Sequence, residues 1–88
     1  MMTKRSVYLS FHRLCGHLHS LAYAVECGGV SESDQARYES ATQEALRAGG
    51  YLAGYEETPR ERANLRAAAS HIGRAWDVLG VPSDERGA

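Results

Sequence analysis

Three stretches of the chain carry apolar residues at alternating spacings of three and four, and this helical periodicity is what most constrains the fold. The stretches span about residues 6–27, 32–56 and 59–79. The glycine pair at 28–29 supplies a left-handed stop after the first, and Pro59 suits the first turn of the third. Short connections make sequential helices antiparallel neighbours. The sequence therefore predicts an all-α fold, a small up-down-up antiparallel three-helix bundle that forms a single domain.

The apolar residues of each stretch define a stripe that we expect to face inward. The predicted stripes are Val7, Phe11, Leu14, Leu18, Leu21 and Val25; Tyr38, Ala41, Ala45, Leu46, Gly49, Leu52 and Tyr55; and Leu65, Ala68, Ala69, Ile72, Ala75, Trp76 and Leu79. The second stripe consists mostly of small residues, which would let a neighbouring helix approach closely. Because its periodicity resumes in phase at Leu52, we expect the helix to run unbroken through Gly49-Gly50, although each glycine costs about 1 kcal/mol relative to alanine.

Residues at the ends of the stretches supply caps and stops. We expect Ser6 to cap the first helix and either Ser31 or Ser33 to begin the second. Thr58 is the expected N-cap of the third helix, with Glu61 completing a capping box. Gly80 should end that helix, and the polar tail at 83–88 should fray.

Size, charge and cysteine placement narrow the class of protein. The chain has 88 residues and a formal net charge of -1, so no global field would hold nucleic acid or an anionic membrane. No apolar run is long enough to span a bilayer. Cys15 and Cys27 would share one helix, about 18 Å apart at 1.5 Å per residue, which is too far for a disulfide. Unpaired cysteines are typical of the reducing cytoplasm, so we expect a cytoplasmic location.

A histidine and cysteine cluster on the first helix is the candidate metal site. His12, Cys15 and His19 share one helical face, and His71 on the third helix could add a fourth ligand. However, three ligands on one straight helix rarely converge on a tetrahedral ion, and the spacing matches no zinc-finger pattern. We therefore predict no metal and no other cofactor, while leaving open whether this cluster binds a metal.

The same face suggests a docking surface. Tyr8, His12, His19 and Tyr23 combine large contact area with polar tips, and they are not needed for the core stripe. They would suit either a protein partner or the seam of a homodimer. The alternative interpretation, an ordinary half-exposed flank, has equal weight.

Arginines form a second candidate surface on the third helix. Arg62, Arg66 and Arg74 lie at spacings of four and eight along its outward face. Guanidinium groups suit an acidic protein partner, or less readily nucleic-acid phosphates. The alternative is a solvated face paired with acids of the second helix, such as Glu39 or Glu44.

The sequence contains few residues arranged as catalytic groups. Cys15 or Cys27 with a histidine is the only candidate nucleophile, and a lowered thiol pKa is conceivable at Cys15 because His12 and His19 flank it. A slender bundle should provide little concave volume, and no third catalytic partner or phosphate-binding loop is present. We therefore expect no catalytic residues.

These observations favour a non-catalytic, protein-binding module that acts by occupying another macromolecule's surface. Nine arginines against the single lysine, Lys4, are typical of a GC-rich bacterial or phage gene. One concrete form would be an inhibitor of the anti-CRISPR type, carried by a phage or mobile element. The alternative hypothesis is a homodimeric helical bundle with a metal or nucleic-acid site. The sequence leaves the partner and the oligomeric state open, and also whether Trp76 belongs to the core or to an interface.

Overall fold

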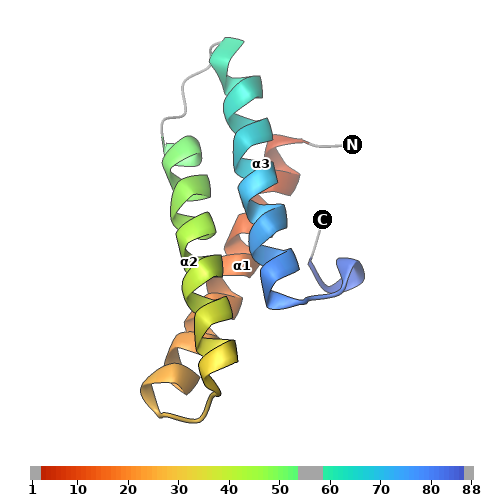
Figure 1. The fold of residues 1–88 in the computed structure, drawn as a ribbon. Coiled ribbons are helices and arrows are strands. Elements are labelled where there is room, and N and C mark those ends of the chain that lie inside the picture. The colour runs from red at the N-terminus through yellow and green to blue at the C-terminus, as the bar shows by residue number, and fades with distance from the viewer. Residues whose placement is uncertain (1–2, 54–58, 87–88) are drawn as a thin grey trace.

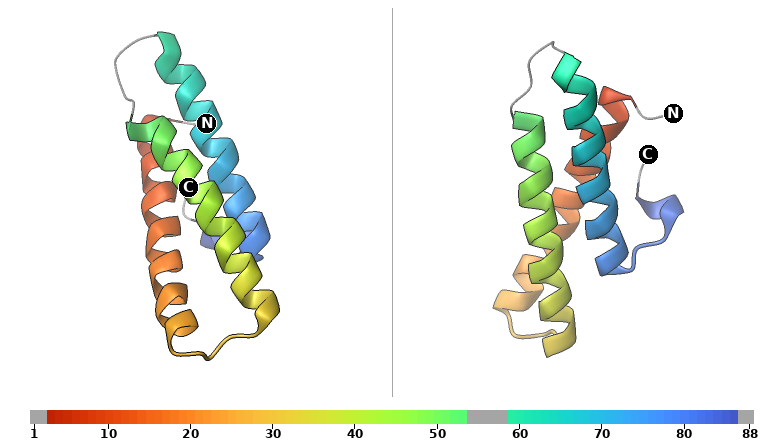
Figure 2. Two further views of the ribbon diagram at one scale, coloured as in Figure 1. Left: turned by 60° about the vertical axis from the view of Figure 1, so that its left-hand side comes forward. Right: turned by 45° about the horizontal axis from the view of Figure 1, so that its top comes forward.

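Three helices account for most of the computed structural model, which describes residues 3–53 and 59–86 (Figure 1). Within these ranges α1 spans Lys4–Glu26, α2 spans Glu32–Ala53, α3 spans Pro59–Leu79, and a short 3-10 helix spans Ser83–Glu85. Consecutive helices run antiparallel, and the molecule measures 44 × 25 × 16 Å (Figures 1 and 2). The predicted antiparallel three-helix bundle is confirmed.

A capping box begins α1. The Thr3 hydroxyl accepts the backbone N–H of Ser6 at 3.1 Å, and Ser6 Oγ accepts the backbone N–H of Thr3 at 2.9 Å. The helix therefore begins at Lys4 with Thr3 as its N-cap, whereas the sequence analysis placed Ser6 in that role. Ser6 takes the reciprocal position that glutamate usually fills, and a serine there gives a weaker sequence signal.

The other helix ends within the described residues agree with the caps and stops predicted from the sequence. Ser31 Oγ accepts the backbone N–H of Asp34 at 3.1 Å, which selects Ser31 over Ser33 as the cap of α2. Gly28 and Gly80 adopt positive φ angles of 71° and 70° after α1 and α3, as expected of left-handed stops. The end of the second predicted helix at residues 54–56 and the predicted Thr58 cap lie outside the described residues.

The second helix is continuous through both glycines, as predicted. A Cβ added to Gly49 would lie 3.4 Å from Phe11 Cζ, so this glycine makes room for an aromatic ring of α1. The periodicity of apolar residues was therefore a better predictor of helix continuity than the helix-breaking tendency of the glycine pair.

The core lies along the shared axis of the three helices and is rich in alanine. Its buried members are Val7, Leu14, Leu18, Ala41, Ala45, Ala48, Leu52, Ala68, Ile72, Ala75 and Trp76. Small buried side chains on α2 and α3 bring these two helices together more extensively than either meets α1. Leu46, predicted to face inward, is 67% exposed, and Ala48 is fully buried instead. The prediction for Leu46 is wrong because Ala45 lies on the buried face, and the next residue is rotated by about 100° around the helix.

Two side-chain hydrogen bonds attach α1 to its neighbours. The Tyr8 hydroxyl donates to the carbonyl oxygen of Leu52 at 3.1 Å, and Trp76 Nε1–H donates to Ser10 Oγ at 3.3 Å. Trp76 is only 3% exposed. The tryptophan is therefore a core residue whose polar edge is satisfied by α1.

The segment after α3 folds back on the bundle (Figure 1). Arg86 Nε–H donates to the carbonyl oxygen of Val81 at 2.8 Å, and its Nη1 lies 2.9 Å from Asp77 Oδ1. We expected the tail to fray from residue 83, but this arginine holds it through residue 86. In the ranges that the structure describes, no helix combines the length and hydrophobicity that crossing a membrane requires.

Candidate functional site

Five residues form the surface of α1 that points away from the bundle, which we call the outer α1 face. They lie at spacings of three and four and are all exposed: Leu9, His12, Gly16, His19 and Tyr23. Leu9 is 46% exposed and Tyr23 is 73% exposed. A folded domain has no internal reason to place such side chains in water, although single exposed apolar residues are common.

Gly16 lies at the centre of this face. A Cβ added there would meet nothing within 4 Å, so no contact inside the protein requires a glycine. In the middle of a helix, glycine costs about 0.5–1 kcal/mol relative to alanine. Its backbone is left bare, so another chain can approach the helix more closely here than at any residue with a side chain.

The structure separates Tyr8 from the other predicted docking residues of α1. The Tyr8 hydroxyl is bound to the Leu52 carbonyl, and its ring packs against the core between α1 and α2. His12, His19 and Tyr23 remain together on the outer α1 face. The sequence analysis missed Leu9 and Gly16 because it selected aromatic and histidine side chains and treated glycine as punctuation.

The predicted ligand candidates do not gather around one point. His71 lies between α2 and α3, where its Nδ1 is 2.6 Å from Glu44 Oε2, and it does not join His12, Cys15 and His19. Among the described residues, no three histidine, cysteine or acidic side chains are grouped in a way that could hold a metal ion.

Cys15 and Cys27 are free and exposed. Partial burial of the Cys15 sulfur raises the pKa of its thiol above the ordinary value. The sequence analysis considered a lowered pKa, so the shift goes in the opposite direction. Partial burial therefore works against formation of the thiolate at Cys15.

The three predicted arginines do not form one uniform surface. Arg62 and Arg66 are exposed and make no ion pair within the described residues. Arg74 is also exposed, but its charge helps to lower the pKa of the Glu44 carboxyl on α2. The solvated, acid-paired interpretation therefore fits Arg74 better than the other two.

Glu44 is the centre of a polar cluster that joins α2 to α3. Its carboxylate lies 2.6 Å from His71 Nδ1 and 3.1 Å from Arg47 Nη1, and the His71 ring stacks on Tyr51 with centroids 5.8 Å apart. The hydrogen bond from His71 is the main cause of the lowered pKa of Glu44, and burial opposes it. Because its partners are satisfied within the fold, this cluster serves the packing of two helices.

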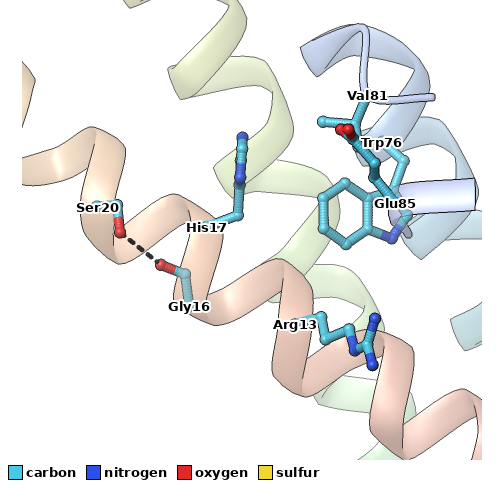
Figure 3. Close-up of a pocket in the computed structure, with 7 residues that line it drawn as sticks. All are labelled: Arg13, Gly16, His17, Ser20, Trp76, Val81 and Glu85. Carbon is cyan, nitrogen blue, oxygen red and sulfur yellow. Dashed lines mark hydrogen bonds between the residues drawn. The ribbon is translucent and has the colours of Figure 1, made fainter. Parts of the chain in front are cut away.

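A pocket of about 320 Å³ opens on the side of the molecule where α1 meets the end of α3 (Figure 3). Its lining residues are Arg13, Gly16, His17, Ser20, Trp76, Val81 and Glu85. The His17 ring lies 5.7 Å from that of Trp76, at an interplanar angle of 59°. The sequence analysis expected little concave volume, and missed this pocket because its outer wall is the folded-back C-terminal segment. Gly16 belongs to both the pocket and the outer α1 face.

No protein family model, curated protein or solved structure matches this chain. Its function must therefore be inferred from its own residues and their geometry.

Proposed function

We propose that the chain is a non-catalytic protein-binding module that docks on another macromolecule through the outer α1 face. The observation that supports this most strongly is the bare backbone at Gly16 within an exposed row of semi-polar and apolar side chains. Gly50 and Gly73 have equally open Cβ positions within their helices, so the exposed side chains of Leu9, His12, His19 and Tyr23 around Gly16 are what distinguish this face.

The side chains around Gly16 suit a protein more than a nucleic acid. Tyrosine and leucine bury apolar area, and histidine presents both a ring and hydrogen-bonding nitrogens. None of the five residues of this face is a lysine or an arginine, whereas binding to a phosphate backbone depends on clustered cations. A cytoplasmic protein partner is therefore the favoured occupant.

A more specific form of the proposal is an inhibitor of the anti-CRISPR type, carried by a phage or mobile element, that blocks a host complex by covering its surface. The arginine-rich composition and the exposed docking face on a simple helical scaffold support this form.

The test compares two matched truncations. Tyr23→Ala and Leu46→Ala each remove a large exposed side chain, 73% and 67% exposed respectively, but only Tyr23 lies on the outer α1 face. Each tagged protein is incubated with nuclease-treated lysate of the source host, and the captured proteins are quantified by mass spectrometry. We expect one dominant protein that wild type and Leu46→Ala retain equally and that Tyr23→Ala loses, with thermal unfolding unchanged in both variants.

Three outcomes would contradict the proposal. Capture that disappears on nuclease treatment would point to nucleic acid and the arginines of α3. Equal capture by Tyr23→Ala would remove the outer α1 face from the interface. A concentration-dependent dimer in light scattering, disrupted by Tyr23→Ala, would assign the face to a homodimer seam.

A further inference from the structure

The outer α1 face continues at both ends into exposed charged residues. Arg5 lies four residues before Leu9, and Glu26 lies three residues after Tyr23. The extended row alternates strictly between spacings of four and three, and we call it the α1 seam: Arg5, Leu9, His12, Gly16, His19, Tyr23 and Glu26. The left view of Figure 2 shows α1 at the edge of the bundle, with no other element against its outer side.

The spacing of the α1 seam matches the repeat of a coiled coil. An alternation of four and three averages 3.5 residues, which is the heptad period. The seam covers three heptads, or about 32 Å at 1.5 Å per residue. A second helix packed along α1 can contact every position of such a row, because its own side chains repeat with the same period.

The side chains of the seam also suit lengthwise packing of a helix. Leu9 and Tyr23 each lie seven residues from Gly16, one on either side, and they are 46% and 73% exposed. Gly16 has open space at its Cβ position, so it leaves a gap between these two side chains. In coiled-coil packing, a large side chain of one helix fills a hole between residues of the other. The gap at Gly16 therefore suits a leucine-sized side chain of a partner helix.

The charges at the two ends of the seam oppose the dipole of their own helix. Arg5 is in the first turn of α1, where the partial charge is positive, and Glu26 is the last residue, where the partial charge is negative. Neither side chain forms an ion pair within residues 3–53 and 59–86. Both charges therefore weaken α1 without a compensating ion pair in the described part of the fold.

An antiparallel helix would compensate both charges. Its C-terminal end carries a partial negative charge and would lie beside Arg5, while its N-terminal end carries a partial positive charge and would lie beside Glu26. A parallel helix would place like charges together at both ends. The signs of Arg5 and Glu26 therefore favour one direction of docking.

We propose that the α1 seam binds an amphipathic helix of the partner protein in antiparallel orientation. This helix carries an acidic residue opposite Arg5, a basic residue opposite Glu26, and large apolar side chains between them. The inference deepens the proposed function and rests on it, since it names the element of the partner that occupies the outer α1 face.

The probe is a fluorescently labelled helical peptide of three heptads with leucine at the positions that face the seam. It carries lysines at its N-terminal end and glutamates at its C-terminal end, and a control peptide has glutamine at all of these charged positions. Fluorescence anisotropy measures binding of each peptide to the whole protein. Wild type should bind the charged peptide about fivefold more tightly than the control, as expected for two exposed ion pairs.

Energy transfer gives the direction of docking. Cys27 is exposed and adjoins Glu26, so a donor can be attached to it in the variant Cys15→Ser. We expect strong transfer to an acceptor on the N-terminus of the charged peptide. Transfer to an acceptor on its C-terminus should be weak, because that end would lie about 32 Å away at the other end of the seam.

Charge reversal in the protein assigns the two ends. The double variant Arg5→Glu, Glu26→Arg should lose the preference for the charged peptide. It should nevertheless unfold at a higher temperature than wild type, because both new charges agree with the dipole of α1. Arg37→Glu reverses an exposed charge on α2, outside the seam, and should leave the preference unchanged.

Four results would overturn this inference. They are no saturable binding of the charged peptide at low millimolar concentration, equal binding of the two peptides to wild type, transfer that is equal or stronger from the C-terminal acceptor, and an unchanged preference in the double variant. A dimer in light scattering that the double variant dissociates would likewise assign the seam to a second copy of this chain.

Failure of this inference is distinguishable from failure of the proposed function. If the charged peptide does not bind and Tyr23→Ala still loses the captured protein, the antiparallel helix is excluded and the docking face stands. If the peptide binds as described and Tyr23→Ala retains the captured protein, the seam accepts a helix but the captured protein does not dock through it.

Discussion

At the residue scale, the carboxylate of Glu44 carries the most concentrated set of polar contacts that the structure describes. His71 and Arg47 both bind it, and Tyr51 stacks on the His71 ring. His71→Ala should lower the free energy of unfolding by about 1 kcal/mol, because it removes the closest hydrogen-bond donor of a partly buried carboxylate. Urea denaturation at pH 7 measures this change. Arg47→Ala should cost less than about 1 kcal/mol, because that side chain is 59% exposed, and equal losses would contradict the ranking.

The same carboxylate gives stability a dependence on pH. The hydrogen bond from His71 lowers the pKa of Glu44 below its ordinary value of 4.5, so the folded state binds this proton less readily than the unfolded state. The resulting stability is present above pH 4.5 and is lost as the pH falls through the lowered folded-state pKa. Urea denaturation between pH 6 and pH 3 should show a smaller decrease for Glu44→Gln than for wild type. Parallel curves would mean that Glu44 is not responsible.

At the scale of single helices, glycines should respond to substitution in opposite ways. Gly16 and Gly50 lie within helices with open space at the Cβ position, so alanine at either should raise the free energy of unfolding by about 0.5–1 kcal/mol. Gly28 has a φ angle of 71°, so Gly28→Ala should lower it by about 1–2 kcal/mol. Thermal and urea unfolding of the three variants provide the measurement. A destabilising Gly16→Ala would reveal an internal reason for that glycine and weaken the docking proposal.

Most features of the helices could be predicted from local sequence. Continuity through Gly49 followed from periodicity, and the stop at Gly28 followed from left-handed glycine chemistry. The sequence analysis placed Leu46 inward on hydrophobicity alone, whereas the spacings of four, three and four through Ala41, Ala45, Ala48 and Leu52 favour Ala48. The burial of Ala48 depends on how closely α2 and α3 approach, which is a property of the pair of helices.

At the scale of the whole molecule, the bundle was predictable and the pocket was not. Short loops and three amphipathic stretches are enough to specify antiparallel packing. The pocket depends on contacts between residues far apart in sequence, such as Trp76 with Ser10, and on the return of the C-terminal segment. The candidate docking residues were recovered in part: His12, His19 and Tyr23 share the outer α1 face, whereas Tyr8 turns toward Leu52.

The return of the C-terminal segment depends on Arg86. Arg86→Ala removes the contacts to Val81 and Asp77 and should loosen the outer wall of the pocket. Because this wall lies outside the helical core, we expect a loss of less than about 1 kcal/mol in the free energy of unfolding. Because Val81 N–H donates to the Trp76 carbonyl oxygen and both residues line the pocket, the fluorescence emission of Trp76 should change in this variant. Unchanged emission would show that Arg86 does not hold this wall beside the indole.

The outer α1 face as a docking surface is tested most directly by a longer side chain at Gly16. Gly16→Gln is compared with Gly50→Gln by measuring how much captured partner protein each retains. Both glycines have open space around them, and glutamine favours helix at both sites, so both variants should fold at least as stably as wild type. We predict that Gly50→Gln retains the partner fully and that Gly16→Gln loses it. Full retention by Gly16→Gln would contradict docking through the outer α1 face.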